Sequence, residues 1–375
     1  MKNLINAKVD EISEELISSI IRLVKIKSVE GEPEEQAPFG LGPKKALEEA
    51  LSLSEELGFQ TKNIDNYAGY AQFGQGFDDA DYIGIFGHLD VVPEGDGWKY
   101  QPYGGEIDGG KIYGRGVLDN KGPIISNLYA LYVLKELGIK TDIPVRIVFG
   151  TNEETGFKDM DYFLKNEKPP VMGWTPDNKF PAIYGERGRA VVEISGEENQ
   201  LDDLFDFMNE YILSSNIYGN KLEIDIKDEE FGLLEMRNYN LRKEDKRVIF
   251  RMSLSYPAIT NKEELREKIQ KKAGDLDVSI VHNFDPVKFE KDSFLVEKLT
   301  EAYMENTDLD PSPLTTTGGT YAKIVPNIIP FGPSFPGQKG IGHNPDEWMI
   351  IEDIILMTKI YANAIYKLIS ERKEG

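Results

Sequence analysis

Three segments of the chain bring histidine or carboxylate side chains together in patterns that suit a metal ion. The first segment contains His88 and Asp90, and the second is a glycine-rich stretch that ends at Asp119. The third carries the adjacent acids Glu153 and Glu154. Imidazole nitrogens and carboxylate oxygens, in a chain without cysteine, suit zinc, manganese or cobalt. The residue types therefore indicate chemistry at a divalent metal ion.

Each of these residues also has an ordinary interpretation. Adjacent acids are common on solvated surfaces, an aspartate in a glycine loop is usually a turn residue, and a histidine after a strand can be a satisfied core residue. Histidine is scarce, however, because the chain contains only His88, His282 and His343. Asp177, in a proline-bounded loop, is a further candidate acid. A site that requires histidine therefore has few possible members.

The candidate residues lie next to expected strand ends and helix starts. Residues 81–87 and 143–149 are short apolar runs that read as buried strands, and they directly precede His88 and the loop of Glu153. Residues 122–137 have helical spacing and follow Asp119. Alternating strands and helices favour a parallel or mixed α/β sheet, and functional groups collect in the loops after its strands. The pattern therefore places the candidate residues at one edge of a sheet.

The length of 375 residues predicts two domains. Helical spacing also marks residues 12–24, 47–57 and 352–369. Between them, the middle of the chain has the order strand, helix, two strands, helix, strand, expected at residues 190–195, 201–213, 222–226, 248–254, 262–272 and 278–281. This order is that of a ferredoxin-like α+β sandwich. We therefore expect a discontinuous α/β domain, residues 1–187 and 284–375, with a ferredoxin-like domain, residues 188–283, inserted into it.

The composition excludes several partners. A net charge of −22 repels phosphate backbones and anionic membranes, so we expect neither nucleic-acid nor membrane binding. The N-terminal residues lack the apolar core of a signal peptide, and the chain has no apolar run long enough to span a bilayer. The absence of cysteine excludes disulfides and thiolate chemistry and fits a reducing compartment. We expect a cytoplasmic protein.

Several motifs resemble those of one enzyme family. These motifs are His88-Leu-Asp90-Val-Val-Pro, Gly97-Trp98, Gly114-Arg-Gly116, Asp119-Asn-Lys-Gly122, Glu153-Glu154-Thr-Gly156 and Gly318-Gly319-Thr320, and they occur in the family's order. From its first helix to its last, the chain resembles the dinuclear metallopeptidases that include dipeptidase V, carnosinase, carboxypeptidase G, aminoacylase and succinyl-diaminopimelate desuccinylase. The dipeptidase V-like branch is the most similar, on the motifs Trp174-Thr-Pro-Asp177, Tyr184-Gly-Glu-Arg-Gly188 and Asn344-Pro-Asp-Glu-Trp-Met349.

The resemblance implies two divalent metal ions in each chain, zinc first, with manganese or cobalt as alternatives. Asp119 is expected to bridge the two ions. His88 and Asp177 are then expected to complete one site, and Glu154 and His343 the other. The family also carries a cis peptide bond after the bridging aspartate, which corresponds here to Asp119-Asn120.

The resemblance also implies catalytic roles beside the metal ligands. Glu153 is expected to be the general base, taking a proton from the attacking water and passing it to the leaving amine. Asp90 is expected to hydrogen-bond the far nitrogen of His88 and to fix its tautomer. The segment Gly318-Gly319-Thr320 is expected to contact the substrate.

The expected inserted domain departs from the family where it usually contacts the substrate. We expect this domain to close over the site like a lid. Relatives usually supply a histidine near its start that stabilises the oxyanion, but residues 195–200 contain none. His282 does not match that position, and a structural or solvated role is the expectation for it.

The family's substrate-binding arginine is also missing from its usual place. It normally lies just before a Tyr-Pro pair, where this chain has Ser255. Arg251 lies on the same face of the expected strand and is our first candidate, because strand side chains repeat every two residues. Arg237 and Arg242 are the other candidates for binding the substrate carboxylate.

The sequence therefore predicts a metal-dependent amidohydrolase that cleaves dipeptides or short peptides. A first alternative is an N-acyl amino acid deacylase, of desuccinylase or deacetylase type, with the same metal chemistry. A second alternative is a non-catalytic peptide-binding paralogue, suggested by the missing histidine. The expected partner is a small peptide substrate, and the expected assembly is a monomer or a homodimer.

Overall fold

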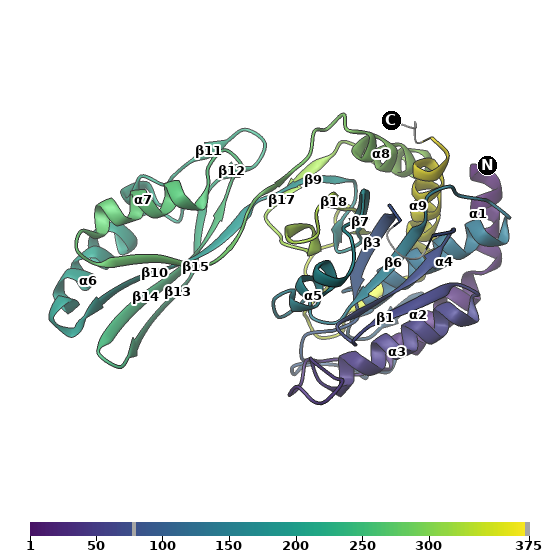
Figure 1. Cartoon of the computed structure of the whole chain (residues 1–375), viewed down its shortest axis with the longest axis horizontal. Coiled ribbons are helices and arrows are strands. Elements are labelled where there is room, and N and C mark those ends of the chain that lie inside the picture. Colours follow the sequence, from purple (N-terminus) through teal and green to yellow (C-terminus); the bar gives the residue numbers. More distant parts are fainter. Residues whose placement is uncertain (77–79, 372–375) are drawn as a thin grey trace. The chain divides into compact units, whose positions relative to one another are not determined.

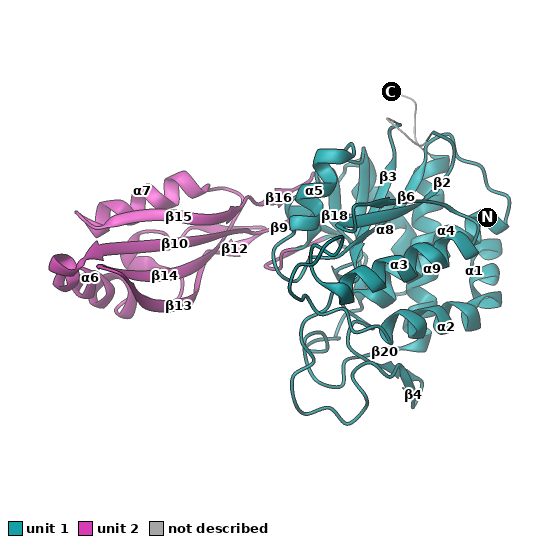
Figure 2. Cartoon of the chain, turned by 60° about the horizontal axis from the view of Figure 1, so that its bottom comes forward, with its two compact units in different colours: residues 1–183, 290–313, 320–375 teal, residues 184–289, 314–319 magenta. Residues whose placement is uncertain are grey.

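The structure, a computed structural model, describes residues 1–76 and 80–371 of the chain (Figure 1). The chain forms two compact units, coloured separately in Figure 2. The first unit comprises Met1–Ile183, Glu290–Pro313 and Thr320–Gly375, and the second comprises Tyr184–Phe289 and Leu314–Gly319. The expected inserted domain, residues 188–283, lies inside the second unit, which takes a few more residues on each side.

The first unit is built on a six-stranded sheet, which is mixed, as predicted. Its strand order is β1-β2-β6-β3-β7-β18. Strands β3, β6, β7 and β18 run parallel to their neighbours within this group, whereas β1 and β2 are antiparallel. In that order across the sheet, the bounds are Gln60–Ile64, Ala68–Phe73, Val145–Gly150, Ile83–His88, Met172–Thr175 and Ile328–Pro330. Every residue of β3 and β6 is buried, which explains why their sequences are mostly apolar. The charged exception inside β6, Arg146, pairs with Glu167 at 3.0 Å.

Helices pack around this sheet. The helices of the first unit are α1 (Lys2–Glu11), α2 (Ser13–Val24), α3 (Leu41–Glu56), α4 (Lys121–Glu136), α5 (Lys158–Asn166), α8 (Phe294–Asn306) and α9 (Ile351–Ser370). Helix α4 packs against α9, α2 and β3 and is buried along most of its length, so it carries apolar residues on several sides. None of the helices that the structure describes is both long and apolar enough to cross a membrane.

Short strands also pair segments that carry or adjoin the candidate residues but lie far apart in the sequence. Strand β20 (Trp348–Ile350) pairs with β5 (Lys111–Tyr113), which also pairs with β4 (Glu106–Asp108). This pairing places the segment before Trp348 next to the glycine-rich stretch that follows Tyr113. Strand β8 (Asn178–Lys179) pairs with β19 (Pro333–Ser334) directly after Asp177.

The second unit contains a four-stranded antiparallel sheet in the order β13-β14-β10-β15. Its strands are Glu235–Glu244, Arg247–Tyr256, Gly188–Glu197 and Asp277–Phe284, respectively. Helix α6 (Leu201–Phe207), continued by a π-helix over Met208–Leu213, and helix α7 (Lys262–Ala273) pack on one face of this sheet. The chain order is β-α-β-β-α-β, so the predicted ferredoxin-like topology is confirmed. Short strands β9 (Ile183–Glu186), β16 (Val287–Lys288) and β17 (Leu314–Thr316) form a separate sheet.

The predicted position of the second strand in this unit was wrong. Residues 222–226 do not form a strand, and Asn220–Leu222 is a 3₁₀ turn. Leu222 and Ile224 alternate because both are fully buried in the core of the unit. The actual strand, β13, is an edge strand with a bulge, and most of its side chains are exposed. An exposed edge strand has no apolar face to reveal it in the sequence.

Candidate metal centre

The candidate residues lie at one edge of the six-stranded sheet of the first unit. His88 is the last residue of β3, Glu153 and Glu154 follow β6, and Asp177 follows β7. These three parallel strands are neighbours in the order β6-β3-β7, so their carboxyl ends meet at the same edge. Asp119 lies just before α4. This is the position at which open α/β sheets hold their functional groups.

The side chains of this group converge around Asp119. The Nε2 atom of His88 lies 3.1 Å from Asp119 Oδ1 and 3.8 Å from Asp177 Oδ2. The Nε2 atom of His343 lies 3.1 Å from Asp119 Oδ2 and 3.0 Å from Glu154 Oε1. The two carboxylate oxygens of Asp119 therefore face two different histidines, each of which also has a second acid beside it.

These residues suit two divalent cations. Ligand atoms of His88, Glu153 and Asp177 lie within 4.8 Å of one another, and so do those of His88, Asp119 and Glu154. Four carboxylates in a largely buried cluster repel one another, and burying uncompensated charge costs free energy. Cations between them would remove this cost. The set of nitrogen and oxygen donors matches zinc, manganese or cobalt.

The two adjacent glutamates have different surroundings. Burial and the neighbouring Asp177 carboxylate raise the pKa of Glu153 well above its usual range. Burial also raises the pKa of Glu154, but a hydrogen bond from His343 opposes this shift. Burial also favours a higher pKa at Asp119. Hydrogen bonds from His343 and His88 outweigh this effect and hold the pKa of Asp119 well below its usual range. Glu153 is therefore the acid of the pair with the stronger tendency to take up a proton.

Asp90 holds the acid pair in place. Its two carboxylate oxygens accept hydrogen bonds from the backbone N–H groups of Glu153 and Glu154, both at 3.1 Å. The Nδ1 atom of His88 is 3.0 Å from the backbone carbonyl oxygen of Asp90 and 3.5 Å from its carboxylate. We predicted a hydrogen bond between Asp90 and the far nitrogen of His88, and the backbone carbonyl of Asp90, not its carboxylate, is the group at hydrogen-bond distance. The hydrogen bonds from Asp90 to the glutamate backbone were not predicted.

A buried ion pair that we did not predict fixes the glycine-rich stretch. Glu347 and Arg115 are both buried and lie 2.8 Å apart. Glu347 Oε1 also accepts hydrogen bonds from the N–H groups of Gly116, Leu118 and Asp119, at 2.9–3.1 Å. Burial raises the pKa of Glu347 to about 7. No local sequence pattern reveals a carboxylate whose partners are more than 200 residues away in the chain.

The side chain of Asn120 connects the end of β3, at His88, with the loop before Asp177. Its side-chain N–H donates to the carbonyl oxygen of Pro176 at 2.6 Å, and its Oδ1 accepts from the backbone N–H of His88 at 3.4 Å. A Cβ atom on Gly87 would lie only 2.5 Å from this Oδ1, so glycine is required there. The Asp119–Asn120 peptide bond is cis, as the resemblance implied.

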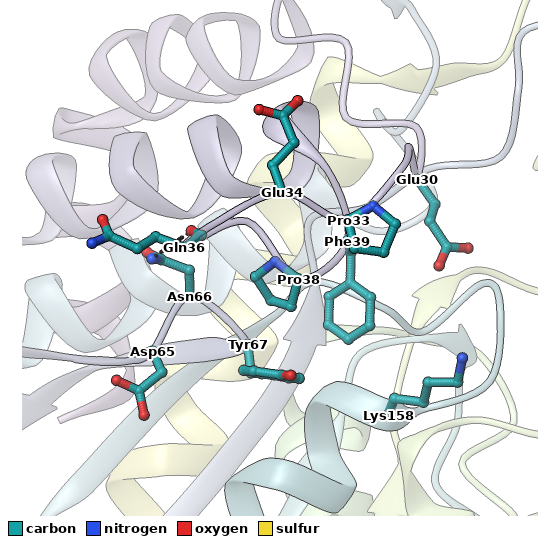
Figure 3. A pocket seen from close by; sticks show the side chains of 10 residues that line it. All are labelled: Glu30, Pro33, Glu34, Gln36, Pro38, Phe39, Asp65, Asn66, Tyr67 and Lys158. Atoms are coloured by element: carbon teal, nitrogen blue, oxygen red, sulfur yellow. Dashed lines mark hydrogen bonds between the residues drawn. The ribbon is translucent and has the colours of Figure 1, made fainter.

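A pocket of about 720 Å³ lies beside the loop that carries the acid pair. Figure 3 shows the rings of Phe39 and Tyr67 among its lining side chains, together with Glu30 and Lys158. The wall of the pocket connects to this loop, because Asn152 Nδ2 lies 3.4 Å from Glu30 Oε1 and Thr151 Oγ1 donates to the carbonyl oxygen of Tyr67 at 2.6 Å. The sequence did not reveal this pocket.

The arginine candidates lie in the second unit and differ in their partners. Arg251 lies on β14, on the same side of the strand as Ser255, and is 3.3 Å from Glu193. Arg242 also pairs with Glu193, at 2.9 Å. Arg237 pairs with Glu235 at 2.5 Å. Each of the three therefore has a carboxylate neighbour within its own unit.

A second pocket, of about 290 Å³, lies on the sheet of this unit and contains an arginine that we did not predict. Arg189 on β10 is directly opposite Ser255 on β14, and within residues 1–76 and 80–371 its guanidinium group has no hydrogen-bond or ion-pair partner. The Ser255 hydroxyl is buried and likewise unpaired in the described part of the chain. His282 and Arg237 also line the pocket. A Cβ on Gly319 would lie 3.5 Å from Arg189 Cζ, so this glycine lies beside the guanidinium group.

A mixed α/β sheet with a histidine–carboxylate cluster at three strand ends, joined to a ferredoxin-like unit, is the architecture of a metallopeptidase. Comparison with known families agrees, since the pattern of Peptidase family M20/M25/M40 matches residues 84–367. The chain belongs to this family.

Individual relatives and solved structures resemble the chain over nearly its full length. The putative dipeptidase YtjP of Bacillus subtilis is 28% identical and aligns over 95% of this chain and 97% of its own. The Beta-Ala-Xaa dipeptidase of Lactobacillus delbrueckii subsp. lactis is also 28% identical, over 99% of each chain. Human carnosine dipeptidase 1 has the same fold, with a TM-score of 0.70 at 17% identity, covering 98% of this chain and 99% of that one.

Proposed function

We propose that the protein is a dipeptidase that hydrolyses dipeptides or short peptides at two divalent metal ions, with Glu153 as the general base. The observation that carries the proposal is the arrangement around Asp119, whose two oxygens face His88 and His343 separately. Asp177 and Glu154 complete the two sites of the proposed centre. Zinc is the first choice of metal, and manganese and cobalt are the alternatives.

The metal ions, Glu153 and Asp90 have separate roles in the proposed hydrolysis. Bound divalent ions would lower the pKa of a water molecule and polarise the scissile carbonyl group. Glu153 then accepts the proton of this water and delivers it to the leaving nitrogen. Asp90 keeps Glu153 and Glu154 in place through their backbone N–H groups.

Recognition of a free substrate carboxylate is assigned to the pocket in the second unit. Arg189 supplies an unpaired guanidinium group and Ser255 an unpaired hydroxyl group, which together suit a carboxylate. Arg251, the first candidate from the sequence, is the alternative, but it already lies beside Glu193. Gly319 lies next to Arg189, which supports the expected contribution of the segment Gly318-Gly319-Thr320 to substrate binding.

A substrate panel tests the proposal. Purified protein, stripped of metal with a chelator and reloaded with zinc, manganese or cobalt, is offered unblocked dipeptides, including a β-alanyl dipeptide, and the same peptides with an acetylated amino group. The proposal predicts metal-dependent hydrolysis of the unblocked peptides. Cleavage of the acyl group alone would instead identify an N-acyl amino acid deacylase of the deacetylase type, and no cleavage in any metal form would contradict the proposal.

A further inference from the structure

Two buried polar side chains, Asp159 and Tyr321, lie next to the loop that carries Glu153 and Glu154. Asp159 belongs to α5, and Tyr321 opens the 3₁₀ turn η4 (Tyr321–Lys323); both are completely buried. The Tyr321 hydroxyl donates a short hydrogen bond to Asp159 Oδ2. The two residues are 162 positions apart in the sequence, so this bond ties together two distant segments of the first unit.

The same carboxylate oxygen holds the backbone just before the proposed base. Asp159 Oδ2 accepts from the N–H groups of Thr151 at 2.7 Å and Asn152 at 2.9 Å. Glu153 is the next residue. Three donors therefore converge on one buried oxygen at the point where the chain leaves β6. Burial raises the pKa of Asp159 to about 6, and these donors offset the cost of burying its charge.

The close packing around Asp159 and Tyr321 leaves no room for a larger residue at the end of β6. A Cβ atom on Gly150, the last residue of β6, would lie 1.9 Å from the Tyr321 hydroxyl oxygen. Only glycine therefore lets the strand end approach the pair. The Tyr321 ring contacts His88 edge-on, with ring centroids 6.3 Å apart. Thr320, an expected substrate contact, caps η4 by accepting a hydrogen bond from the N–H of Ala322 at 3.2 Å.

We propose that the Asp159–Tyr321 pair is a positioning element of the reaction, which fixes the direction in which Glu153 leaves the end of β6. This inference rests on the proposed role of Glu153. The rival is that the pair only stabilises the fold, as buried hydrogen-bonded pairs commonly do. The convergence of three donors beside the proposed base favours the positioning role, because a displacement of about 1 Å in a catalytic group can cost about 100-fold in rate.

The variant Tyr321→Phe tests the proposal with the smallest change. It removes one hydroxyl group and leaves Asp159 bonded to both backbone N–H groups. We expect kcat on a dipeptide to fall about 10- to 100-fold, with KM nearly unchanged and the metal content of the wild type retained. Tyr303→Phe is the matched control, because Tyr303 is also fully buried in the first unit and its hydroxyl has no hydrogen-bond partner among the described residues. It should leave kcat unchanged.

A double variant separates positioning from general destabilisation. If the two side chains act as a unit, Asp159→Asn combined with Tyr321→Phe should lose no more kcat than Asp159→Asn alone. Fully additive losses would contradict the proposal. So would a normal kcat in Tyr321→Phe, or a loss of kcat in this variant that only follows a loss of bound metal.

Hydrogen exchange provides a measurement that does not depend on activity. Tyr321→Phe should accelerate amide exchange in the peptide covering residues 151–156, whereas Tyr303→Phe should not. Unchanged exchange there would overturn the positioning role even if the protein hydrolysed no peptide. Conversely, an active wild type with an inactive Glu153→Gln and a fully active Tyr321→Phe would leave the proposed function intact and remove only this inference.

Discussion

Two adjacent residues of one type can have different tasks when their surroundings differ. Glu154 hydrogen-bonds His343, which gives it a place in the proposed metal set. Glu153 lies beside the same cluster, but burial and Asp177 raise its pKa strongly. The backbone of both residues is fixed by Asp90. The proposed division into one ligand and one base therefore rests on position, not on residue type.

Glu153→Gln should separate these two tasks. Glutamine keeps the size of the side chain but does not accept a proton, so we expect kcat to fall by about 10²- to 10⁴-fold. Elemental analysis should still find the metal content of the wild type. Glu32→Gln, an exposed glutamate, serves as the control for a single lost charge. Turnover near that of the wild type would show that another group takes the proton.

Arg189→Ala tests the assigned carboxylate contact. Hydrogen bonds to charged groups contribute about 1.5–3 kcal/mol, so KM for dipeptides should rise about 10- to 100-fold. KM for the corresponding dipeptide amides should change little. Arg251→Ala is the matched comparison, because this arginine lies on the same sheet but beside Glu193. If Arg251→Ala produced the selective effect and Arg189→Ala did not, the original sequence prediction would be correct and our reassignment wrong.

At the scale of elements, the sequence predicted those helices and strands whose apolar residues follow a regular local pattern. Apolar runs located β3 and β6, and helical spacing located α2, α4 and α9, because burial sets both patterns. Strand β13 was missed because its side chains are largely exposed. The motifs also indicated His88, His343, Glu154 and Asp177, which lie around Asp119 in the structure, but they did not indicate Glu347.

Contacts between distant segments were not predictable in this way. The bonds of Glu347 to the stretch before Asp119, and of Asp159 to Tyr321, join residues far apart in the chain. Nothing in the neighbouring residues of either acid distinguishes it from a solvated one. The same is true of Arg189, whose position opposite Ser255 depends on the register of two strands.

Glu347→Gln should show how strongly one such contact supports the fold. It leaves Arg115 buried without its ion-pair partner, and breaking a buried pair costs about 3–5 kcal/mol. Chemical denaturation should therefore give a clearly lower free energy of unfolding. Glu198→Gln breaks the exposed pair with Lys243 and should have no measurable effect. Equal stability of both variants would contradict the assigned role of Glu347.

At the scale of the whole molecule, the two units carry different parts of the proposed activity. The five expected ligands and Glu153 all belong to the first unit, whereas Arg189 and Ser255 belong to the second. In the proposed centre, therefore, no side chain of the second unit is a metal ligand. Substitutions at Arg189 should change KM and leave the metal content unchanged, and this separation distinguishes a substrate-binding defect from a damaged metal centre.

The central claim is that Asp119 bridges two divalent ions, and the metal content of Asp119→Ala tests it most directly. Elemental analysis of protein reloaded with zinc should find two ions in each wild-type chain and fewer than one in Asp119→Ala, because both sites lose the shared carboxylate. Asp96→Ala, which removes an exposed acid, should retain two ions. Two ions in Asp119→Ala, or none in the wild type, would contradict the account.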